Sequence, residues 1–162
     1  MRRALIALAV LLAIVLPGSG RAEAAPRWSI EIVGTTNWPT EFAEVLESLR
    51  MTYGIPISYN NACVATQPCI HFYHYQAADG LGGFVTGWPG RRGSSELAVN
   101  DTYDRGHSYR LEVLYHEFGH ALGLVQHSPA CQSSMQPTVG MCGSYMMGYT
   151  PTEQQRLRAI WG

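Results

Sequence analysis

Lysine is absent from this chain of 162 residues, and charged residues of every kind make up only 14% of it. Arginine therefore supplies all 11 basic side chains, which 12 acidic side chains offset to a formal net charge of −1. Proteins that bind nucleic acid usually carry a basic excess, so we expect no nucleic-acid partner. The 46% share of hydrophobic residues argues against a disordered, highly charged chain, and the length suits one domain with its own core.

Long apolar runs are also missing, apart from residues 4–16, which follow two arginines. That run is shorter than the ~20 residues that a membrane-spanning helix needs. A break rich in proline and glycine comes next, and then Ala-Glu-Ala, whose small residues suit a signal peptidase. We predict a signal peptide over residues 1–24 and a secreted domain over residues 25–162, with no membrane contact after cleavage. A retained membrane anchor is the alternative.

Hydrophobic periodicity in the remaining chain predicts strands and helices in the order of an α+β domain with a small twisted sheet. Thr40 is the expected N-cap of a first helix, because apolar residues recur after it at helical spacing. A longer helix is expected over residues 109–122 with Ser108 as its cap, and a last helix after Thr150. The predicted strands are residues 28–33, 55–59, 69–75, 84–88 and 96–99.

The long helix carries the segment His116-Glu117-Phe-Gly-His120. Two histidines four residues apart lie on one helical face, so both imidazoles can bind one metal ion. Glu117 lies one step round the helix, outside the ligands but close enough to take a proton from water. This pattern alone also occurs by chance on surface helices. Here Gly123 and then His127 follow, and a third histidine would complete a zinc site with one position left for water.

The segment from His116 to Ser128 resembles the metzincin zinc peptidases, and its core H-E-x-G-H-A-L-G-L is most similar to the matrixins. The metzincin pattern would place the third ligand at Gln126, whereas His127 comes one residue later. An amide oxygen is a poor zinc ligand beside imidazole, and one extra loop residue costs little. We therefore predict His127 as the ligand.

The downstream residues support that choice. Met135-Gln-Pro resembles the Met-turn of the matrixins, and Met135 lies eight residues after His127, the matrixin interval. The resemblance implies that Met135 packs beneath the metal ligands. It also implies a zincin-like α+β fold, with a twisted mixed sheet, an active-site helix and a C-terminal helix.

The function implied by this resemblance is that of a secreted zinc metalloendopeptidase. His116, His120 and His127 would bind one zinc ion, and Glu117 would act as general base. The expected partner is an extended polypeptide substrate, bound along the strand at residues 84–88 by a monomeric enzyme. Two alternatives remain at this point: a catalytically silent metzincin-like secreted binding protein, and a zinc amidase acting on a cell-wall amide.

Four cysteines allow three pairings. We favour Cys63 with Cys69 and Cys131 with Cys142, because each pair is local and closes a loop that needs restraint. The second pair brackets the Met-turn, as in the small secreted metzincins of the snapalysin type, which this chain also resembles. A cysteine-based metal site is the alternative.

Two further sets of residues have more than one interpretation. Asp79, Asp101 and Asp104 fall in predicted turns, where they would either bind Ca²⁺ or simply form the turns. Tyr145 and Tyr149 follow the Met-turn and would either donate a hydrogen bond to the developing oxyanion or pack in the core. The short stretch before the first strand leaves no room for a prodomain, so we expect no latency segment.

Overall fold

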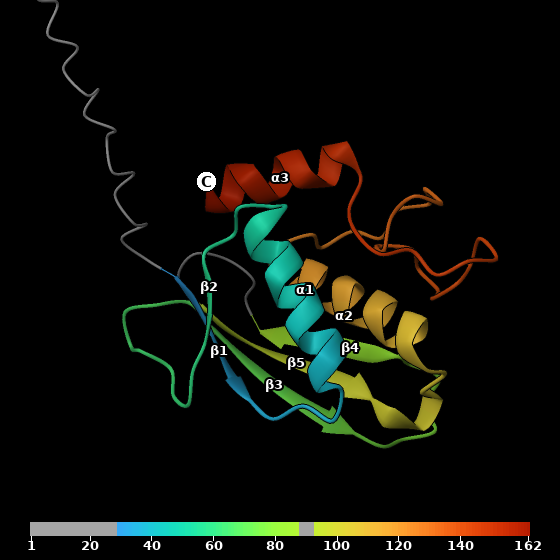
Figure 1. Ribbon diagram of the computed structural model, residues 1–162, viewed down its shortest axis with the longest axis horizontal. Helices are drawn as coiled ribbons and strands as arrows, with labels where there is room; N and C mark the ends of the chain where they lie inside the picture. The colour runs from blue at the N-terminus through green and yellow to red at the C-terminus, as the bar shows by residue number, and fades with distance from the viewer. Residues whose placement is uncertain (1–28, 88–92) are drawn as a thin grey trace, which may run out of the picture.

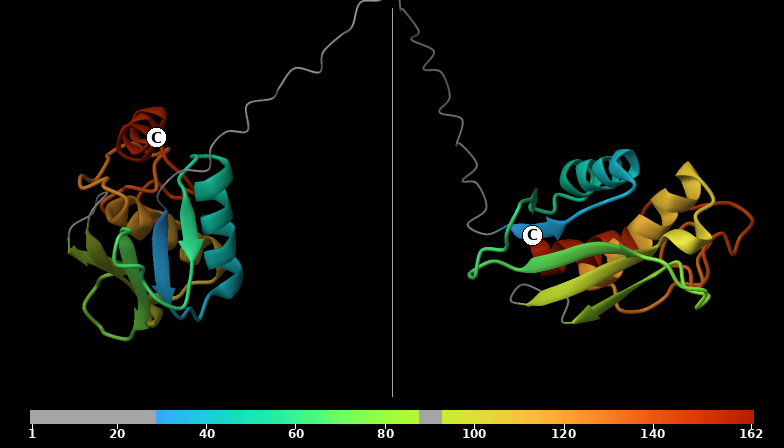
Figure 2. Two further views of the ribbon diagram at one scale, coloured as in Figure 1. Left: turned by 90° about the vertical axis from the view of Figure 1, so that its left-hand side faces the viewer. Right: turned by 90° about the horizontal axis from the view of Figure 1, so that it is seen from below.

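The computed structural model describes residues 29–87 and 93–162. Two of its three helices, α1 and α2, cover one face of a five-stranded sheet, and the third, α3, lies beyond them (Figure 1). The same layering is visible from two other directions in Figure 2. The elements are β1 (Ile30–Gly34), α1 (Pro39–Met51), β2 (Ile57–Tyr59), β3 (Cys69–Tyr75), β4 (Gly83–Gly87), β5 (Ser94–Asn100), the 3-10 turn η1 (Asp101–Tyr103), α2 (His107–Ala121) and α3 (Pro151–Trp161).

This order confirms the predicted α+β fold, although most boundaries differ from the predicted ones by one or two residues. The strand expected at residues 69–75 is β3 with the same bounds. The predicted start of the first strand at Trp28, the predicted end of the fourth strand at Trp88 and the predicted signal peptide lie outside the described residues. Among the residues described, no helix is both long and apolar enough to cross a membrane.

The sheet is mixed, with strand order β2-β1-β3-β5-β4. Every neighbouring pair runs parallel except β4 and β5, which are antiparallel and pair Phe84 with Ala98. Strand β4 is therefore an edge strand with one free row of main-chain groups. Helix α2 packs against both β4 and β5, so the free edge of β4 lies next to this helix.

The core lies between the sheet and the two helices. The apolar stripe predicted for α1 is buried throughout, as are Leu111, Leu114 and Phe118 of α2. The Phe118 ring is stacked on that of Phe72 from β3, with centroids 6.3 Å apart. These contacts fix α2 on the sheet, which leaves the opposite side of α2 free to carry polar groups.

Two of the three predicted helix caps are wrong. Helix α1 begins at Pro39, with Trp38 at the N-cap, because the fixed φ of proline suits the first helical position; Thr40 therefore lies inside the helix. Helix α2 begins at His107 after Gly106, whose φ of 90° makes the turn into the helix, and Ser108 lies in the first turn. Thr150 does cap α3, in a reciprocal capping box with Glu153.

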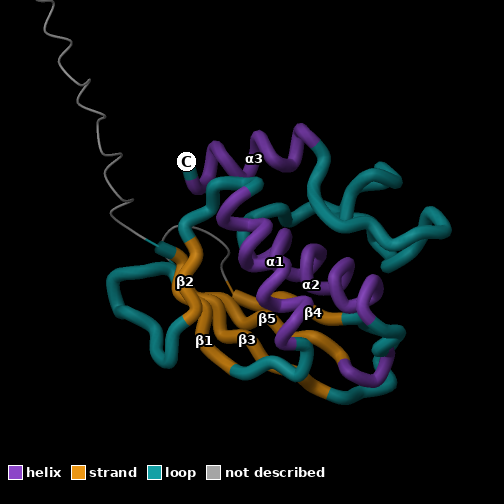
Figure 3. The backbone as a smooth tube through the Cα atoms, viewed as in Figure 1, coloured by secondary structure: helices purple, strands orange, loops and turns teal. Residues whose placement is uncertain are grey.

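Both predicted disulfides, Cys63–Cys69 and Cys131–Cys142, are present, so all four cysteines are bonded. The sulfur atoms of Cys63 and Cys69 lie near His71, but disulfide sulfur cannot supply the thiolate that binds metal. The alternative of a cysteine-based metal site is therefore wrong for this oxidised fold. The second disulfide restrains the long loop between α2 and α3, which Figure 3 shows in teal.

Candidate metal centre

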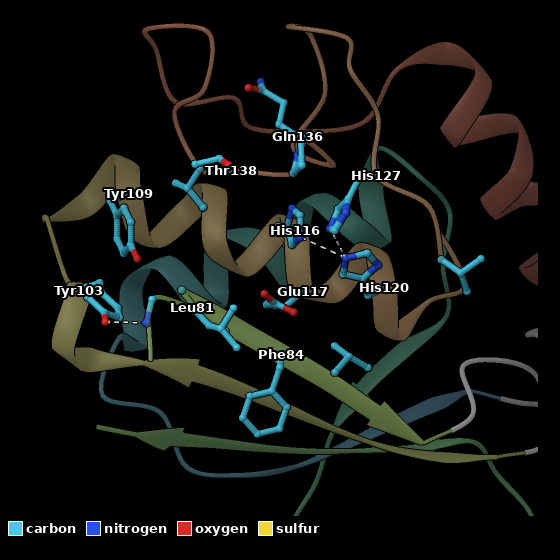
Figure 4. Close-up of a pocket in the computed structure, with 18 of the residues that line it drawn as sticks. Leu81, Phe84, Tyr103, Tyr109, His116, Glu117, His120, His127, Gln136 and Thr138 are labelled. Atoms are coloured by element: carbon cyan, nitrogen blue, oxygen red, sulfur yellow. Dashed lines mark hydrogen bonds between the residues drawn. The ribbon is translucent and has the colours of Figure 1, made fainter. Parts of the chain in front are cut away.

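Three histidine side chains converge on one point beside α2 (Figure 4). His116 and His120 lie one turn apart on the same face of the helix, and His127 reaches them from the following loop. The Nε2 atom of His120 lies 3.1 Å from that of His116 and 3.2 Å from that of His127. The structure thus brings the three predicted ligands together. Gln126, where the family pattern would place the third ligand, is exposed and does not line the cleft.

The outer nitrogens of the two helical rings fix their tautomers. Nδ1 of His116 lies 2.8 Å from the carbonyl oxygen of Ser134, and Nδ1 of His120 lies 2.8 Å from that of Leu124. A carbonyl can only accept, so each Nδ1 carries the proton and each Nε2 presents a lone pair. Burial lowers the pKa of His116 to about 4 and lowers the pKa of His120 as well, which keeps both rings neutral.

Two lone pairs that face each other at 3.1 Å repel one another unless a cation lies between them. A zinc ion with tetrahedral ligands at ~2.0–2.1 Å separates neighbouring ligand atoms by roughly 3.3 Å, close to the two spacings found here. Three imidazoles with one side open to the cleft are a donor set typical of catalytic zinc. The residues present therefore fit a zinc ion.

Glu117 lies beside this cluster with its carboxylate between α2 and β4 (Figure 4). It is only 5% exposed, and its Oε2 atom has no hydrogen-bond partner among the described residues. Burial raises the pKa of Glu117 to about 8 in the absence of a metal ion, and a nearby dication would favour the ionised form. A carboxyl group held in this way can accept and release a proton near neutral pH.

Gly83, the first residue of β4, makes room for that carboxylate. A Cβ atom at this position would lie 2.8 Å from Cγ and 2.9 Å from Oε1 of Glu117. On the other side it would lie 2.6 Å from the carbonyl oxygen of Ala98. The edge strand can therefore pass directly over Glu117 only because residue 83 has no side chain.

Met135 is fully buried beneath the histidines. Its sulfur packs against Gly119, between the two helical ligands, where a Cβ atom would collide with it. This contact explains a glycine inside a helix, where it is otherwise unfavourable. The turn is closed by the amide of Ser128, which donates to the carbonyl of Met135 at 2.7 Å. The turn thus supports His127 on one side and, through the carbonyl of Ser134, His116 on the other.

A cleft of about 1060 Å³ runs across the three histidines and Glu117. One wall is the segment from Gly80 through β4, and the opposite wall is α2 with residues 136–139. The free edge of β4 thus lines the cleft beside the site. An extended chain in this cleft can pair with β4 and lie over the histidine cluster.

Glu112 is a residue to which the sequence analysis gave no role. It lies one turn before His116 on α2, is fully buried, and accepts a hydrogen bond from the amide of Gly140 at 3.1 Å. Its Oε1 atom has no partner among the described residues, and burial raises its pKa. Glu112 thus attaches the loop beyond the cleft wall to the helix. Its position four residues before His116, on the same helical face as His116 and His120, was the available signal.

The three aspartates considered for Ca²⁺ each have separate protein partners. Asp79 accepts from the amide of Leu81 at 2.9 Å, and Asp104 pairs with Arg110 at 2.6 Å. Asp101 accepts from the side chain of Asn37 at 2.7 Å. In the described part of the chain none of them belongs to a candidate metal cluster. Asp79 and Asp104 each accept from a backbone amide two residues on, as turn formers do, whereas Asp101 joins its turn to Asn37, 64 residues away.

Tyr149 is not available to an oxyanion. It is buried, and its hydroxyl donates to the carbonyl of Tyr115 at 2.7 Å. The Tyr145 ring packs edge-on against Tyr109, with centroids 6.1 Å apart. Packing is therefore the role that the structure gives to both tyrosines that follow the Met-turn.

Comparison with known proteins gives one structural match and one sequence family. A solved structure of archaemetzincin from Archaeoglobus fulgidus, in complex with malonate, is similar to 79% of this chain and 98% of its own length. The TM-score of that match is 0.46, at 16% sequence identity. A comparison with curated protein sequences finds no match. A sequence model of the matrixins matches residues 33–162, which include all three histidines, Glu117 and Met135. The chain therefore belongs to the matrixin family of zinc metallopeptidases.

Proposed function

We propose that this protein is a secreted zinc endopeptidase that cleaves extended polypeptides. His116, His120 and His127 would bind one zinc ion, and Glu117 would serve as general base and then as general acid. The observation that carries the proposal is the convergence of three Nε2 atoms beside a buried carboxylate that has a free oxygen. Family membership supports zinc-dependent peptidase chemistry in general, and the arrangement of these four side chains supports the specific assignment.

The roles of the chain's own residues follow from their positions. Zinc, when bound, would lower the pKa of a water molecule and polarise the scissile carbonyl. Glu117 accepts the proton of the attacking water at its unpartnered Oε2 and then donates it to the leaving amine nitrogen. The carbonyls of Ser134 and Leu124 keep the rings of His116 and His120 oriented throughout.

Strand β4 is the proposed binding edge for the substrate. Its inner edge pairs with β5, and its other edge lines the cleft above Glu117. A peptide added there by main-chain hydrogen bonds is held extended, with its scissile carbonyl beside the histidine cluster. Such binding needs a polypeptide on both sides of the scissile bond, which favours endopeptidase activity over hydrolysis of an isolated amide.

The first test measures metal content and cleavage together. Purified protein should contain close to one zinc per chain and cleave casein and a quenched peptide library. Glu117→Ala should retain zinc and lose cleavage, whereas His127→Ala should lose zinc and Gln126→Ala should keep both. Full zinc content without turnover of any peptide would instead favour the silent binding protein. Release of amides from cell wall, without cleavage of polypeptides, would favour the amidase.

Secretion and a monomeric state belong to the same proposal. Two disulfides suit an oxidising compartment, which supports export. Sequencing the N-terminus of protein collected from culture medium should give Ala25 as the first residue, and light scattering should give the mass of one chain. Protein that stays in the cell with residues 1–24 attached would contradict export.

A further inference from the structure

One end of the cleft contains a cation without an acidic partner. Arg105, two residues before α2, lines the cleft, and its guanidinium carbon lies 5.9 Å from the centre of the Tyr109 ring. It forms no ion pair with any residue that the structure describes. The neighbouring carboxylate, Asp104, is occupied by Arg110 through two contacts of 2.6 and 2.9 Å. The positive charge of Arg105 is therefore free to attract a ligand.

The distribution of charge along the cleft is uneven, with the exposed positive charge at the Arg105 end. Among the described residues that line the cleft, Glu117 is the only carboxylate and Arg105 the only guanidinium. Glu117 is buried beside the histidines, whereas Arg105 is exposed. The opposite end of the cleft is formed by Gly123, Val125 and Ile160, which carry no charge. A negatively charged substrate side chain is thus attracted to the Arg105 end.

At the Arg105 end, the walls of the cleft are aromatic and aliphatic side chains, and the charged guanidinium lies at the rim. Tyr109 projects from the first turn of α2, so that its hydroxyl lies 3.1 Å from the position of a Cβ atom on Gly82. Tyr103 is held in place by the amide of Gly80, which donates to its hydroxyl at 2.7 Å. Leu81 lies between these two rings and the histidines in Figure 4. A side chain with a methylene stem and a carboxylate tip fits such walls.

We propose that Arg105 is a specificity-determining residue, which selects substrates with a glutamate side chain at the position that enters this end of the cleft. The guanidinium would pair with the carboxylate while the stem packs on Tyr109. The inference rests on the proposed endopeptidase function, and it concerns substrate choice and not the chemical step. Because Arg105 is exposed, the preference should weaken as salt concentration rises.

The test uses quenched peptides in sets that differ only by Glu, Gln or Lys at each position around the scissile bond. At one position the wild type should favour Glu by about fivefold in kcat/KM, as expected for an exposed ion pair with a charge-assisted hydrogen bond. Arg105→Gln should bring this ratio to about one, and Arg105→Glu should favour Lys over Glu. Arg156→Gln, an exposed arginine of α3 outside the cleft, is the matched control and should leave the ratio unchanged.

A binding measurement separates failure of this inference from failure of the proposed function. Fluorescence anisotropy would report the affinity of labelled Glu and Gln peptides for zinc-loaded Glu117→Ala protein. Tighter binding of the Glu peptide that disappears with Arg105→Gln supports the inference even if no peptide is cleaved, an outcome that rejects the endopeptidase alone. Equal binding of both peptides, no binding of either, or a preference that survives Arg105→Gln overturns the inference.

Discussion

The substitution Gly83→Ala tests the contact between the edge strand and the proposed general base. The new Cβ atom would lie 2.6 Å from the Ala98 carbonyl oxygen and less than 3 Å from two atoms of Glu117. A backbone carbonyl in a paired strand cannot move aside cheaply, so β4 or the carboxylate must shift. Overpacking of this kind costs about 1–3 kcal/mol, partly offset by ~0.5–1 kcal/mol because alanine loses less backbone entropy than glycine.

Activity should fall much more than stability. A displacement of about 1 Å at a catalytic group reduces the rate by about 10²-fold, so we expect such a loss in kcat/KM with zinc content unchanged. The histidines do not contact Gly83, which is why zinc analysis separates this effect from loss of the metal site.

The neighbouring substitution Gly82→Ala is the matched control. Its Cβ atom would meet only side-chain atoms, at 3.1 Å from Tyr109, 3.3 Å from Val113 and 3.9 Å from Val139. Those side chains can move by a few tenths of an ångström, so kcat/KM should change by less than about fivefold. In urea unfolding, Gly82→Ala should lose less stability than Gly83→Ala. If Gly83→Ala keeps kcat/KM within about threefold of wild type, the strand does not constrain Glu117 as described.

Three further predictions concern stability. Replacing both Cys131 and Cys142 by serine should lower the free energy of unfolding by about 3 kcal/mol, the loop-closure value for their separation of 11 residues; a loss below ~1 kcal/mol in urea titrations would refute a restraining role for this disulfide. Burial raises the pKa of Glu112 in the folded state above that in the unfolded chain. The fold is therefore favoured at low pH, where Glu112 is protonated, and it loses this contribution to the free energy of unfolding as pH rises through the folded-state pKa. Metal-free Glu112→Gln should therefore gain stability relative to wild type between pH 5 and pH 8, and a constant difference would contradict this. Removal of zinc with a chelator should lower the Tm of the wild type and of Glu117→Ala, because zinc at ~1,000 times its Kd adds about 4 kcal/mol to the free energy of unfolding. The Tm of His120→Ala should not change with the chelator. If it falls as much as that of the wild type, zinc does not bind through the His120 ring.

Features that depend on local sequence could be predicted well. The apolar stripe of α1 identifies that helix because its periodicity decides which face is buried, and the aromatic-rich run at residues 69–75 identifies β3 by strand propensity. The capping box at Thr150 involves residues only three apart, so the sequence shows both partners. The predicted caps at Thr40 and Ser108 failed because a proline and a positive-φ glycine nearby set the helix starts instead.

Features that depend on contacts distant in the sequence could not be predicted. Glu112 meets Gly140 across 28 residues, and Gly83 meets Glu117 only because α2 packs on the edge strand. No local pattern fixes either distance. A glycine inside a strand can indicate a close approach by another group, but the predicted strand began at residue 84, so Gly83 lay outside it and gave no sign of the contact with Glu117.

The late position of the third histidine follows from how the helix ends. Gly123, with φ of 108°, turns the chain back, and the Leu124 amide then donates to the carbonyl of Gly119 at 2.8 Å. The carbonyl of Leu124 at the same time receives the proton of His120 Nδ1, so the backbone is fixed up to this residue. The next fixed point is Ser128, tied to Met135, which leaves the three residues between them to span the gap. In that span the exposed Val125 and Gln126 are free of constraint, and the extra residue is absorbed there. The turn at Met135 therefore fixes which side chain faces the other two histidines, and spacing counted from Met135 identifies the third ligand better than spacing counted from the helix.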